Sequence, residues 1–171
     1  MSDRLETVRE TSETFEELYV REYRAIVALA YALSGSRAAA EDLAQEAFLA
    51  AHRNWETVAD LDAPGAWVRR VVANLSASAF RRGVAETKAL SRLAFGRQRV
   101  LPELSADDAE FWRAVRSLPR RQTQVIALHY LEDRPVAEIA EILGTADGTV
   151  KKHLHDGRQA LARRLRLEEG D

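Results

Sequence analysis

The sequence contains no cysteine among its 171 residues, and this absence removes several classes of protein at once. Disulfide-bonded scaffolds, thiolate zinc sites and enzymes with a cysteine nucleophile are all excluded. No apolar run approaches the roughly 20 residues of a membrane-spanning helix. The N-terminal sequence MSDRLETVRE also lacks the apolar core of a secretory signal. We therefore expect a cytoplasmic protein that does not insert into a membrane.

A strong net charge is absent too, because 25 lysines and arginines nearly balance 27 aspartates and glutamates. The charges are nevertheless unevenly distributed along the chain. Residues 1–20 are acidic, whereas residues 81–99 and 147–167 are basic. This segregation suggests separate partners for separate faces, although solvent-exposed helices often carry similar charge. The basic segment 81–99 is either a plain spacer or a contributor to binding.

Apolar residues recur at helical spacing in the first half of the sequence. We expect a long helix that ends at Gly35, a second helix that begins after Ser36 and a third that begins at Pro64. Residues 54–63, rich in polar and turn-forming residues, are expected to form a loop between the second and third helices. Three such helices can close one small core.

The second half predicts a bundle of about four short helices. Ser105 followed by Asp108 resembles a capping box and predicts a helix start. Pro119 and Pro135 begin two further helices, and a last one occupies about residues 147–167.

No segment of the sequence predicts a sheet. We therefore predict an all-α fold of two small helical domains, residues 1–82 and 106–171, joined by a flexible linker over residues 83–105. A short helix near residues 85–95 is expected within this linker.

The segment 135–161 has the spacing of a helix-turn-helix motif. Gly144 permits the left-handed backbone of a tight turn, and Val150 and Leu154 can anchor the second helix. The second helix of such a motif enters the major groove of DNA. An ordinary helical hairpin with a basic surface explains the same spacing and stays open as an alternative. The candidate DNA-binding residues on this helix are Thr149, Lys151, Lys152, His153 and Arg158.

These segments resemble a known family. SLPRRQTQVIALHYLEDRPVAEIAEILGTADGTVKKHLHDGRQAL resembles region 4 of the extracytoplasmic-function (ECF) sigma factors of bacterial RNA polymerase, group IV of the sigma-70 family. In the first half, AEDLAQEAFLAAHRNW resembles the core-polymerase-binding helix of sigma region 2. APGAWVRRVVANLSASAFRR resembles the helix of that region that melts promoters and reads the −10 element. The two matches stand in the family's order and together cover most of the chain.

The resemblance implies an alternative sigma factor, which is not an enzyme and needs no cofactor. Such a protein binds the β′ clamp and β flap of core RNA polymerase. It reads the −35 element with its C-terminal domain, and it reads and opens the −10 element with its N-terminal domain. The implied partners are core polymerase, promoter DNA and an anti-sigma factor. Because this chain has no cysteine, a thiol-based redox signal would have to be sensed by such a partner.

The resemblance assigns polymerase binding to one helix of the first half. Two of its carboxylates lie four residues apart and therefore share a helical face, where they can meet a basic docking surface. A plain solvated face is one alternative. A metal or acid–base site is another, but no histidine or third acid stands at helical spacing to complete it. The candidate residues are Asp42, Gln45, Glu46 and Phe48.

The resemblance assigns −10 DNA binding to the helix that follows Pro64. Arginines can hold phosphates, an asparagine can read a base edge, and an exposed aromatic ring can stack on an unpaired base. For Trp67 the alternative is a core position, because its spacing with Val71 is that of a buried face. Residues 54–63 correspond to the family's base-capturing loop, and Ser78 stands where the family often has an acid. The candidate residues are Trp67, Arg69, Arg70, Asn74, Arg81 and Arg82.

The region 4 segment departs from common family members, which have Ser-Arg in place of Lys152-His153 and Arg-Ala in place of Asp156-Gly157. Gly157 costs about 1 kcal/mol of helix propensity relative to alanine. The two histidines of the segment, His153 and His155, are two residues apart, so they point in nearly opposite directions and cannot grip one metal ion.

Two other functions remain as alternatives to a sigma factor. A stand-alone helix-turn-helix regulator leaves the first-half motifs unexplained. A helical adaptor or enzyme lacks a phosphate-binding loop, a metal-ligand set and a nucleophile motif.

Overall fold

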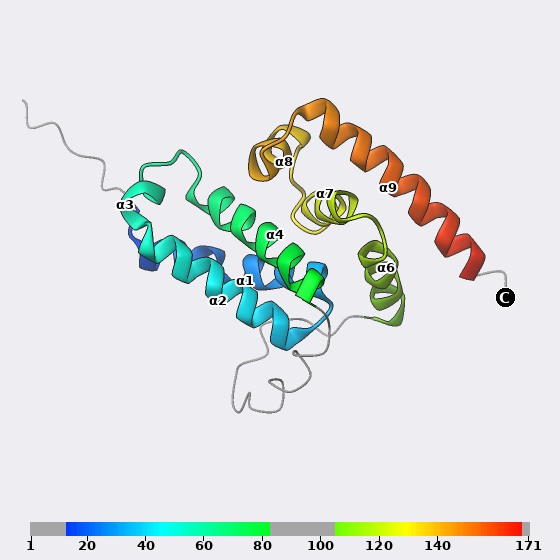
Figure 1. Ribbon diagram of the computed structural model, residues 1–171, viewed down its shortest axis with the longest axis horizontal. Helices are drawn as coiled ribbons and strands as arrows, with labels where there is room; N and C mark the ends of the chain where they lie inside the picture. Colours follow the sequence, from blue (N-terminus) through cyan, green and yellow to red (C-terminus); the bar gives the residue numbers. More distant parts are fainter. Residues whose placement is uncertain (1–12, 83–104, 169–171) are drawn as a thin grey trace, which may run out of the picture.

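Eight helices and no strand make up the part of the chain that the structure describes, residues 13–82 and 105–168 (Figure 1). The structure is a computed structural model. The N-terminal half contains α1 (Phe15–Ser34), α2 (Arg37–Arg53), α3 (Trp55–Val58) and α4 (Pro64–Arg82). The C-terminal half contains α6 (Ala106–Arg116), α7 (Arg120–Tyr130), α8 (Val136–Leu143) and α9 (Asp147–Glu168). The predicted all-α fold is confirmed, while the predicted linker with its short helix lies outside the described residues, apart from Ser105.

Local capping signals set the helix ends of the N-terminal half. Thr14 opens α1 through a capping box with Glu17, in which each side chain bonds the other residue's backbone N–H. Gly35 ends α1 in the left-handed conformation, with φ +71°, as predicted. Ser36 caps α2 by accepting a hydrogen bond from the backbone N–H of Ala39 at 3.3 Å. These ends are therefore determined within a few residues of sequence.

The segment predicted as a plain loop, residues 54–63, contains a helix instead. The four-residue helix α3 forms directly after α2, and the backbone N–H of Val58 donates to the Asn54 carbonyl at 2.9 Å. The Val58 side chain is buried and Trp55 packs against the core, so two apolar side chains hold this turn against the rest of the half. The expectation of a loop was wrong here because a single helical turn leaves no periodicity in the sequence.

Turn chemistry positions the helix-turn-helix motif of the C-terminal half. Gly144 ends α8 with φ +63°, and the backbone N–H of Thr145 donates to the Ala140 carbonyl at 3.0 Å. The chain then enters α9, whose inner face is anchored by Val150 and Leu154, both buried. The predicted spacing of the two helices is thus present, with α9 extending far beyond α8 (Figure 1).

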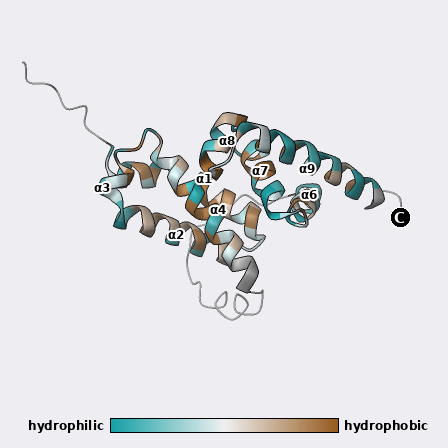
Figure 2. Cartoon of the chain, turned by 45° about the horizontal axis from the view of Figure 1, so that its top comes forward, coloured by the Kyte–Doolittle hydropathy of each residue, from teal (hydrophilic) through white to brown (hydrophobic). Residues whose placement is uncertain are grey.

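Apolar side chains from both halves join in one continuous core. Helices α1, α2 and α4 pack together, as do α7, α8 and α9. In addition, α4 packs on α8 and α1 packs on α6 and α7. The outer face of α9 is mainly hydrophilic (Figure 2). The two halves are therefore in direct contact, which no sequence pattern had indicated.

We call this surface of contact the interdomain interface. Its polar members from the N-terminal half are Glu22, Arg69, Arg70 and the carbonyl groups of Ala32 and Ala73. Those from the C-terminal half are Arg116, Gln124, Glu132 and the carbonyl groups of Glu141 and Ile142.

Candidate nucleic-acid interface

The first turns of α9 present a basic face to solvent. Thr149, Lys151 and Lys152 are exposed, while Val150 and Leu154 beneath them are buried. The chain reaches this face through the Gly144 turn, which places the start of α9 clear of α8. A helix presented in this way, with its N-terminal residues accessible, is the arrangement that a helix-turn-helix motif uses in the major groove.

Arg158, further along α9, is held by side chains of α7. Its Nε–H donates to the hydroxyl of Tyr130 at 2.6 Å, and its guanidinium lies 5.5 Å from the centre of that ring. Its Nη2 also lies 3.2 Å from Nε2 of His129, whose Nδ1 is 3.3 Å from the Arg134 carbonyl. A neutral imidazole protonated on Nδ1 satisfies both contacts. The sequence interpretation named Arg158 but missed Tyr130 and His129, which fix its direction.

Gly157, which looked like a weak point in the DNA-binding helix, lies on its inner face. The residue is buried, and a Cβ atom at this position would approach Cγ1 of Ile126 to 3.2 Å. Glycine therefore allows α9 to pack closely on α7, and this contact offsets its poor helix propensity. His153 and Asp156 are half-buried beside the exposed face.

The residues expected to read −10 DNA have diverse positions on α4. Asn74 is exposed, whereas Trp67 is half-buried and packs against the core. The hydroxyl of Ser78 donates to the Asn74 carbonyl at 3.4 Å. The side chains of Arg81 and Arg82 lie outside the described part of the structure.

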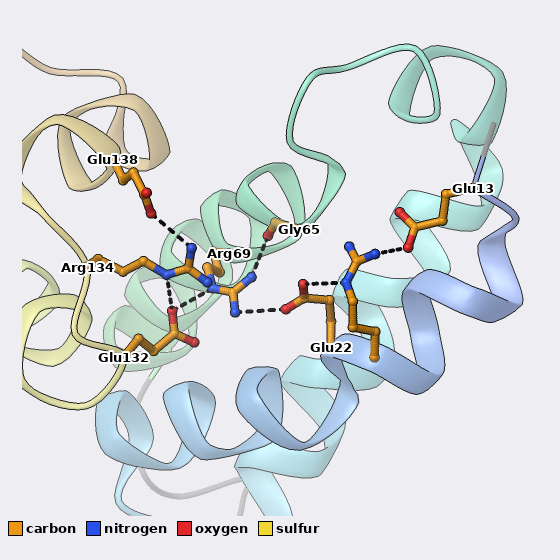
Figure 3. A network of polar contacts seen from close by, with 8 residues as sticks. Glu13, Glu22, Gly65, Arg69, Glu132, Arg134 and Glu138 are labelled. Atoms are coloured by element: carbon orange, nitrogen blue, oxygen red, sulfur yellow. Dashed lines mark hydrogen bonds and ion pairs between the residues drawn. The ribbon is translucent and has the colours of Figure 1, made fainter. Parts of the chain in front are cut away.

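Arg69 is buried at the centre of a polar network between the two halves (Figure 3). Its side chain is 3% exposed, and its Nε–H donates to Oε2 of Glu132 at 2.5 Å. Its Nη2 lies 2.8 Å from Oε2 of Glu22, and its Nη1–H donates to the Gly65 carbonyl at 3.1 Å. A Cβ atom on Gly65 would come within 2.9 Å of Glu22 Oε1 and 3.0 Å of Arg69 Nη1, so glycine makes room for this ion pair.

The electrostatics of the network favour the charged form of both partners. Burial lowers the pKa of the Arg69 guanidinium, but Glu132 and Glu22 more than offset this, so the pKa lies above its ordinary value. Burial raises the pKa of the Glu22 carboxyl, but Arg69, assisted by Arg21, brings it below its ordinary value. Arg69 is therefore a structural counter-ion in this conformation.

Arg70 and Arg116 make reciprocal contacts across the interdomain interface. Arg70 of α4 donates to the last carbonyls of α8, from Nε to Ile142 at 2.9 Å and from Nη2 to Glu141 at 2.5 Å. Arg116 of α6 donates from Nη1 to the Ala32 carbonyl at 3.4 Å, near the end of α1. Each half thus directs an arginine at the negative end of a helix in the other half.

Gln124 adds a buried hydrogen bond to the same interface. Its Nε2–H donates to the Ala73 carbonyl of α4 at 3.0 Å, and its Oε1 accepts from Arg121 at 3.1 Å. The sequence interpretation did not identify Gln124, Glu132 or Arg116. The only available signal was a polar residue, Gln124, within the apolar segment of α7. A pocket of about 260 Å³ remains beside this contact.

The outward face of α2 is acidic and polar. Asp42, Gln45 and Glu46 are all exposed, with Leu49 one turn further along and 52% exposed. Phe48, named with these three as a polymerase-binding candidate, is only 2% exposed. Its ring packs edge-on against Tyr19 with ring centres 4.9 Å apart, because it faces α1. Phe48 therefore supports the helix that presents the other three side chains.

Two halves of the chain match two sequence models of one family. The model "Sigma-70 region 2" matches residues 18–85, and "Sigma-70, region 4" matches residues 108–161. The ECF RNA polymerase sigma factor SigW of Bacillus subtilis (strain 168) is 32% identical over 155 residues, which span 82% of this chain and 83% of that protein. The chain is an ECF sigma factor.

Other relatives agree with this assignment. The ECF RNA polymerase sigma factor SigM of Mycobacterium tuberculosis (strain ATCC 25618 / H37Rv) is 30% identical over 152 residues, covering 88% of this chain and 76% of SigM. The sigma factor RpoE from Bartonella quintana, solved in complex with the anti-sigma factor NepR, shares the fold with a TM-score of 0.70 at 24% identity. That match covers 89% of this chain and 96% of RpoE.

As a member of this family, the sigma factor is a DNA-binding transcription initiation factor. The stand-alone regulator is not favoured, because the region 2 match accounts for the N-terminal half as well. Within the described residues, no group of three or more acidic or histidine side chains could hold a metal ion. Among those same residues, no helix is long and apolar enough to cross a membrane.

The structure separates the predicted site residues into those that are exposed and those that bond the other half of the chain. Asp42, Gln45 and Glu46 form one exposed face, and Thr149, Lys151 and Lys152 form another. Arg69 and Arg70, in contrast, are engaged at the interdomain interface.

Proposed function

We propose that this sigma factor reads −35 DNA with α9 and −10 DNA with α4, and binds core RNA polymerase through the exposed face of α2. The observation that carries the proposal is the basic face at the start of α9. Thr149, Lys151 and Lys152 stand exposed on a helix whose inner side is fixed by buried Val150 and Leu154. Lysines can contact phosphate or guanine, and threonine can contact backbone or base.

On this proposal, residues 1–82 serve polymerase binding and −10 recognition, and residues 106–171 serve −35 recognition. Asn74 is an exposed residue of α4 that can meet a base edge. The other residues assigned to −10 DNA are Trp67, Arg69, Arg70, Arg81 and Arg82. His153 and Arg158 flank the α9 face, where Arg158 is held in direction by Tyr130.

Polymerase docking on α2 is supported by three exposed polar side chains of net negative charge, Asp42, Gln45 and Glu46. We also propose an anti-sigma partner, because RpoE, which shares this fold, was solved in complex with one. Sigma activity of this kind belongs in the cytoplasm, with core polymerase.

The test is transcription by sigma-free bacterial core polymerase on fragmented genomic DNA of the source organism, with sequencing of the RNA 5′ ends. We expect defined start sites that appear only when this chain is added. Asp42→Ala with Glu46→Ala should lower the affinity for core, while the exposed Glu16→Ala on α1 should not. A chain that neither binds core nor produces specific starts would contradict the proposal.

A further inference from the structure

The pocket beside Gln124 has a volume of about 260 Å³ and lies where α1, α4, α6 and α7 meet. Its lining residues are Leu33, Ser76, Ala77, Arg116, Leu118, Arg120, Thr123 and Gln124. We propose that it binds a small carboxylic acid with an apolar body, whose carboxylate pairs with the Arg116 guanidinium. None of the lining residues belongs to the faces assigned to DNA or polymerase, so this site is additional to the proposed function and does not depend on it.

Arg116 is a half-buried cation that no carboxylate neutralises within the described residues. Its Nη1–H donates to the Ala32 carbonyl at 3.4 Å, and it makes no other hydrogen bond or ion pair there. Arg69, at the other polar contact between the halves, pairs with two carboxylates. Charged side chains that leave water are ordinarily paired, and a guanidinium carries several N–H donors. Arg116 therefore has the capacity to hold an anion that the chain itself does not supply.

The electrostatics of Arg116 agree with this vacancy of charge. Burial lowers the pKa of its guanidinium, Tyr31 raises the pKa only in part, and Arg113 lowers it again, so the pKa lies below its ordinary value. For Arg69 the balance is the opposite, because its two carboxylates raise the pKa above its ordinary value. A carboxylate brought to Arg116 by a ligand would offset the cost of burial as Glu132 does for Arg69.

Gly35 determines where the Arg116 guanidinium lies. A Cβ atom at this glycine would come within 2.7 Å of Nε and 2.9 Å of Cζ of Arg116, so any other residue would displace the guanidinium. Gly35 also has the left-handed backbone that ends α1, with φ +71°. The end of α1 thus admits the cation at close range, two residues after Leu33 of the pocket wall.

The remaining polar groups of the lining are already committed. The hydroxyls of Ser76 and Thr123 each donate to a backbone carbonyl at 2.8 Å. The side-chain amide of Gln124 is bonded through both its nitrogen and its oxygen. Of the described residues that line the pocket, none is acidic, and Arg120 adds a second positive charge at an exposed position. The pocket therefore selects an anion rather than a cation or a neutral polar group.

The size and the apolar walls of the pocket define the rest of the ligand. Leu33, Ala77 and Leu118 supply apolar surface, and Ala77 and Leu118 are themselves buried. At about 30 Å³ per water molecule, the volume corresponds to roughly nine waters, which is room for a ligand of about ten non-hydrogen atoms. Inorganic anions would leave these walls uncovered. A carboxylate on a ring or a short chain matches both the charge and the walls.

The first experiment titrates the full chain with 4-fluorobenzoate and follows the ligand by fluorine NMR. A ligand of this size that fits its site should bind with a Kd of about 1 mM. The matched neutral probe, 4-fluorobenzamide, has the same number of non-hydrogen atoms and should bind at least about tenfold more weakly, because it lacks the charge-assisted hydrogen bond to Arg116. Inorganic phosphate at the same concentration should not displace 4-fluorobenzoate.

Three variants locate the binding. Arg116→Met keeps a long side chain but removes the charge and should weaken 4-fluorobenzoate binding by at least about tenfold. Arg113→Met is the control, because Arg113 is exposed on the same helix and does not line the pocket, and its Kd should stay within about twofold of the parent. Ser76→Leu fills the pocket from its half-buried wall without altering any charge and should also weaken binding. Urea titration verifies that each variant is folded.

The outcomes decide the proposal without DNA or polymerase. Saturable binding of 4-fluorobenzoate that Arg116→Met and Ser76→Leu both weaken, and Arg113→Met does not, supports the site. Equal binding of the benzamide, displacement by phosphate, or an unchanged Kd in Arg116→Met overturns it, and so does the absence of binding in the millimolar range. Because no step uses a promoter, failure of the proposed function would leave this result unaffected.

Discussion

The helices α4 and α9 are both assigned to promoter DNA, yet the fold treats their basic side chains in opposite ways. Lys151 and Lys152 of α9 are exposed, whereas Arg69 of α4 is buried against two carboxylates. Each helix contacts three others, α9 the helices α6, α7 and α8 and α4 the helices α1, α2 and α8, so their arrangement and not their number accounts for the difference. Helix α9 packs through one inner face, while α4 lies between α1 and α2 on one side and α8 on the other. On a helix that is enclosed on two sides, a basic residue such as Arg69 is buried and pairs with neighbouring carboxylates.

The largest expected effect is a loss of stability when Arg69 of the enclosed helix α4 is replaced. Arg69→Ala removes the buried cation that Glu132 and Glu22 share and leaves them only Arg134 at 3.4 Å and Arg21 at 3.1 Å, so we expect the free energy of unfolding to fall by about 3 kcal/mol. Urea unfolding at neutral pH measures this. The neighbouring Arg70→Ala is the control and should cost less than about 1 kcal/mol, because its partners are neutral carbonyls at an exposed site. Equal losses in the two variants would contradict the contrast between them.

On the exposed helix the effect should be on DNA binding and not on stability. Lys151→Ala with Lys152→Ala should weaken binding to promoter duplex by about tenfold and reduce the salt slope by about 0.9 for each phosphate that the two lysines neutralise. Fluorescence anisotropy at several salt concentrations measures both. Arg163→Ala with Arg166→Ala removes the same charge from exposed positions near the other end of α9. If this control lowered the slope equally, binding would depend on net charge alone.

Two glycines of α9, Gly148 and Gly157, differ in the space around them, so substituting each by alanine compares the outer face of the helix with its inner face. Gly148 has open space where a Cβ would stand, so Gly148→Ala should raise the free energy of unfolding by about 0.5 kcal/mol. Gly157→Ala brings a Cβ to 3.2 Å from Ile126 Cγ1 and should lower it by about 0.5 kcal/mol despite better helix propensity. Thermal and urea unfolding measure both free energies. A stabilising Gly157→Ala would show that the contact between α9 and α7 can accommodate an added methyl group.

The smallest expected effect is on the pH dependence of stability, and it comes from Glu22, a carboxylate of the Arg69 network. The pKa of Glu22 is below its ordinary value of 4.5 in the folded protein, so the folded state binds fewer protons than the unfolded state near that pH. Its contribution to stability is present above the unfolded pKa and is lost as pH falls through the folded pKa. Glu22→Gln should therefore show a shallower loss of unfolding free energy between about pH 5 and about pH 3. Parallel curves would contradict this role of Glu22.

Helix positions were predictable because their signals are local. Gly35, Ser36 and Gly144 act within a few residues, and the helix ends predicted from them are present. The exposed face of α9 followed from the spacing of Val150 and Leu154. The one-turn helix α3 was missed because four residues carry no periodicity.

The interdomain interface was not predictable, because its partners are distant in sequence. Arg69 and Glu132 are 63 residues apart, and nothing near either residue indicates the other. Resemblance to the family suggested DNA for Arg69, and the structure adds a second partner for the same group. Gly157 is a similar case, since the reason for glycine lies on α7 at Ile126.

The reciprocal arginine contacts and the Arg69 ion pairs differ in the charge of their acceptors. Arg70 and Arg116 bond carbonyl oxygens, which carry no net charge and are readily rehydrated when released. Of the two carboxylates that hold Arg69, Glu22 lies in the same half as the arginine and Glu132 in the other half, where Arg134 also lies 3.4 Å from it. The Arg69–Glu132 pair is thus where the charges of the two halves meet, while the two reciprocal arginines end on neutral acceptors.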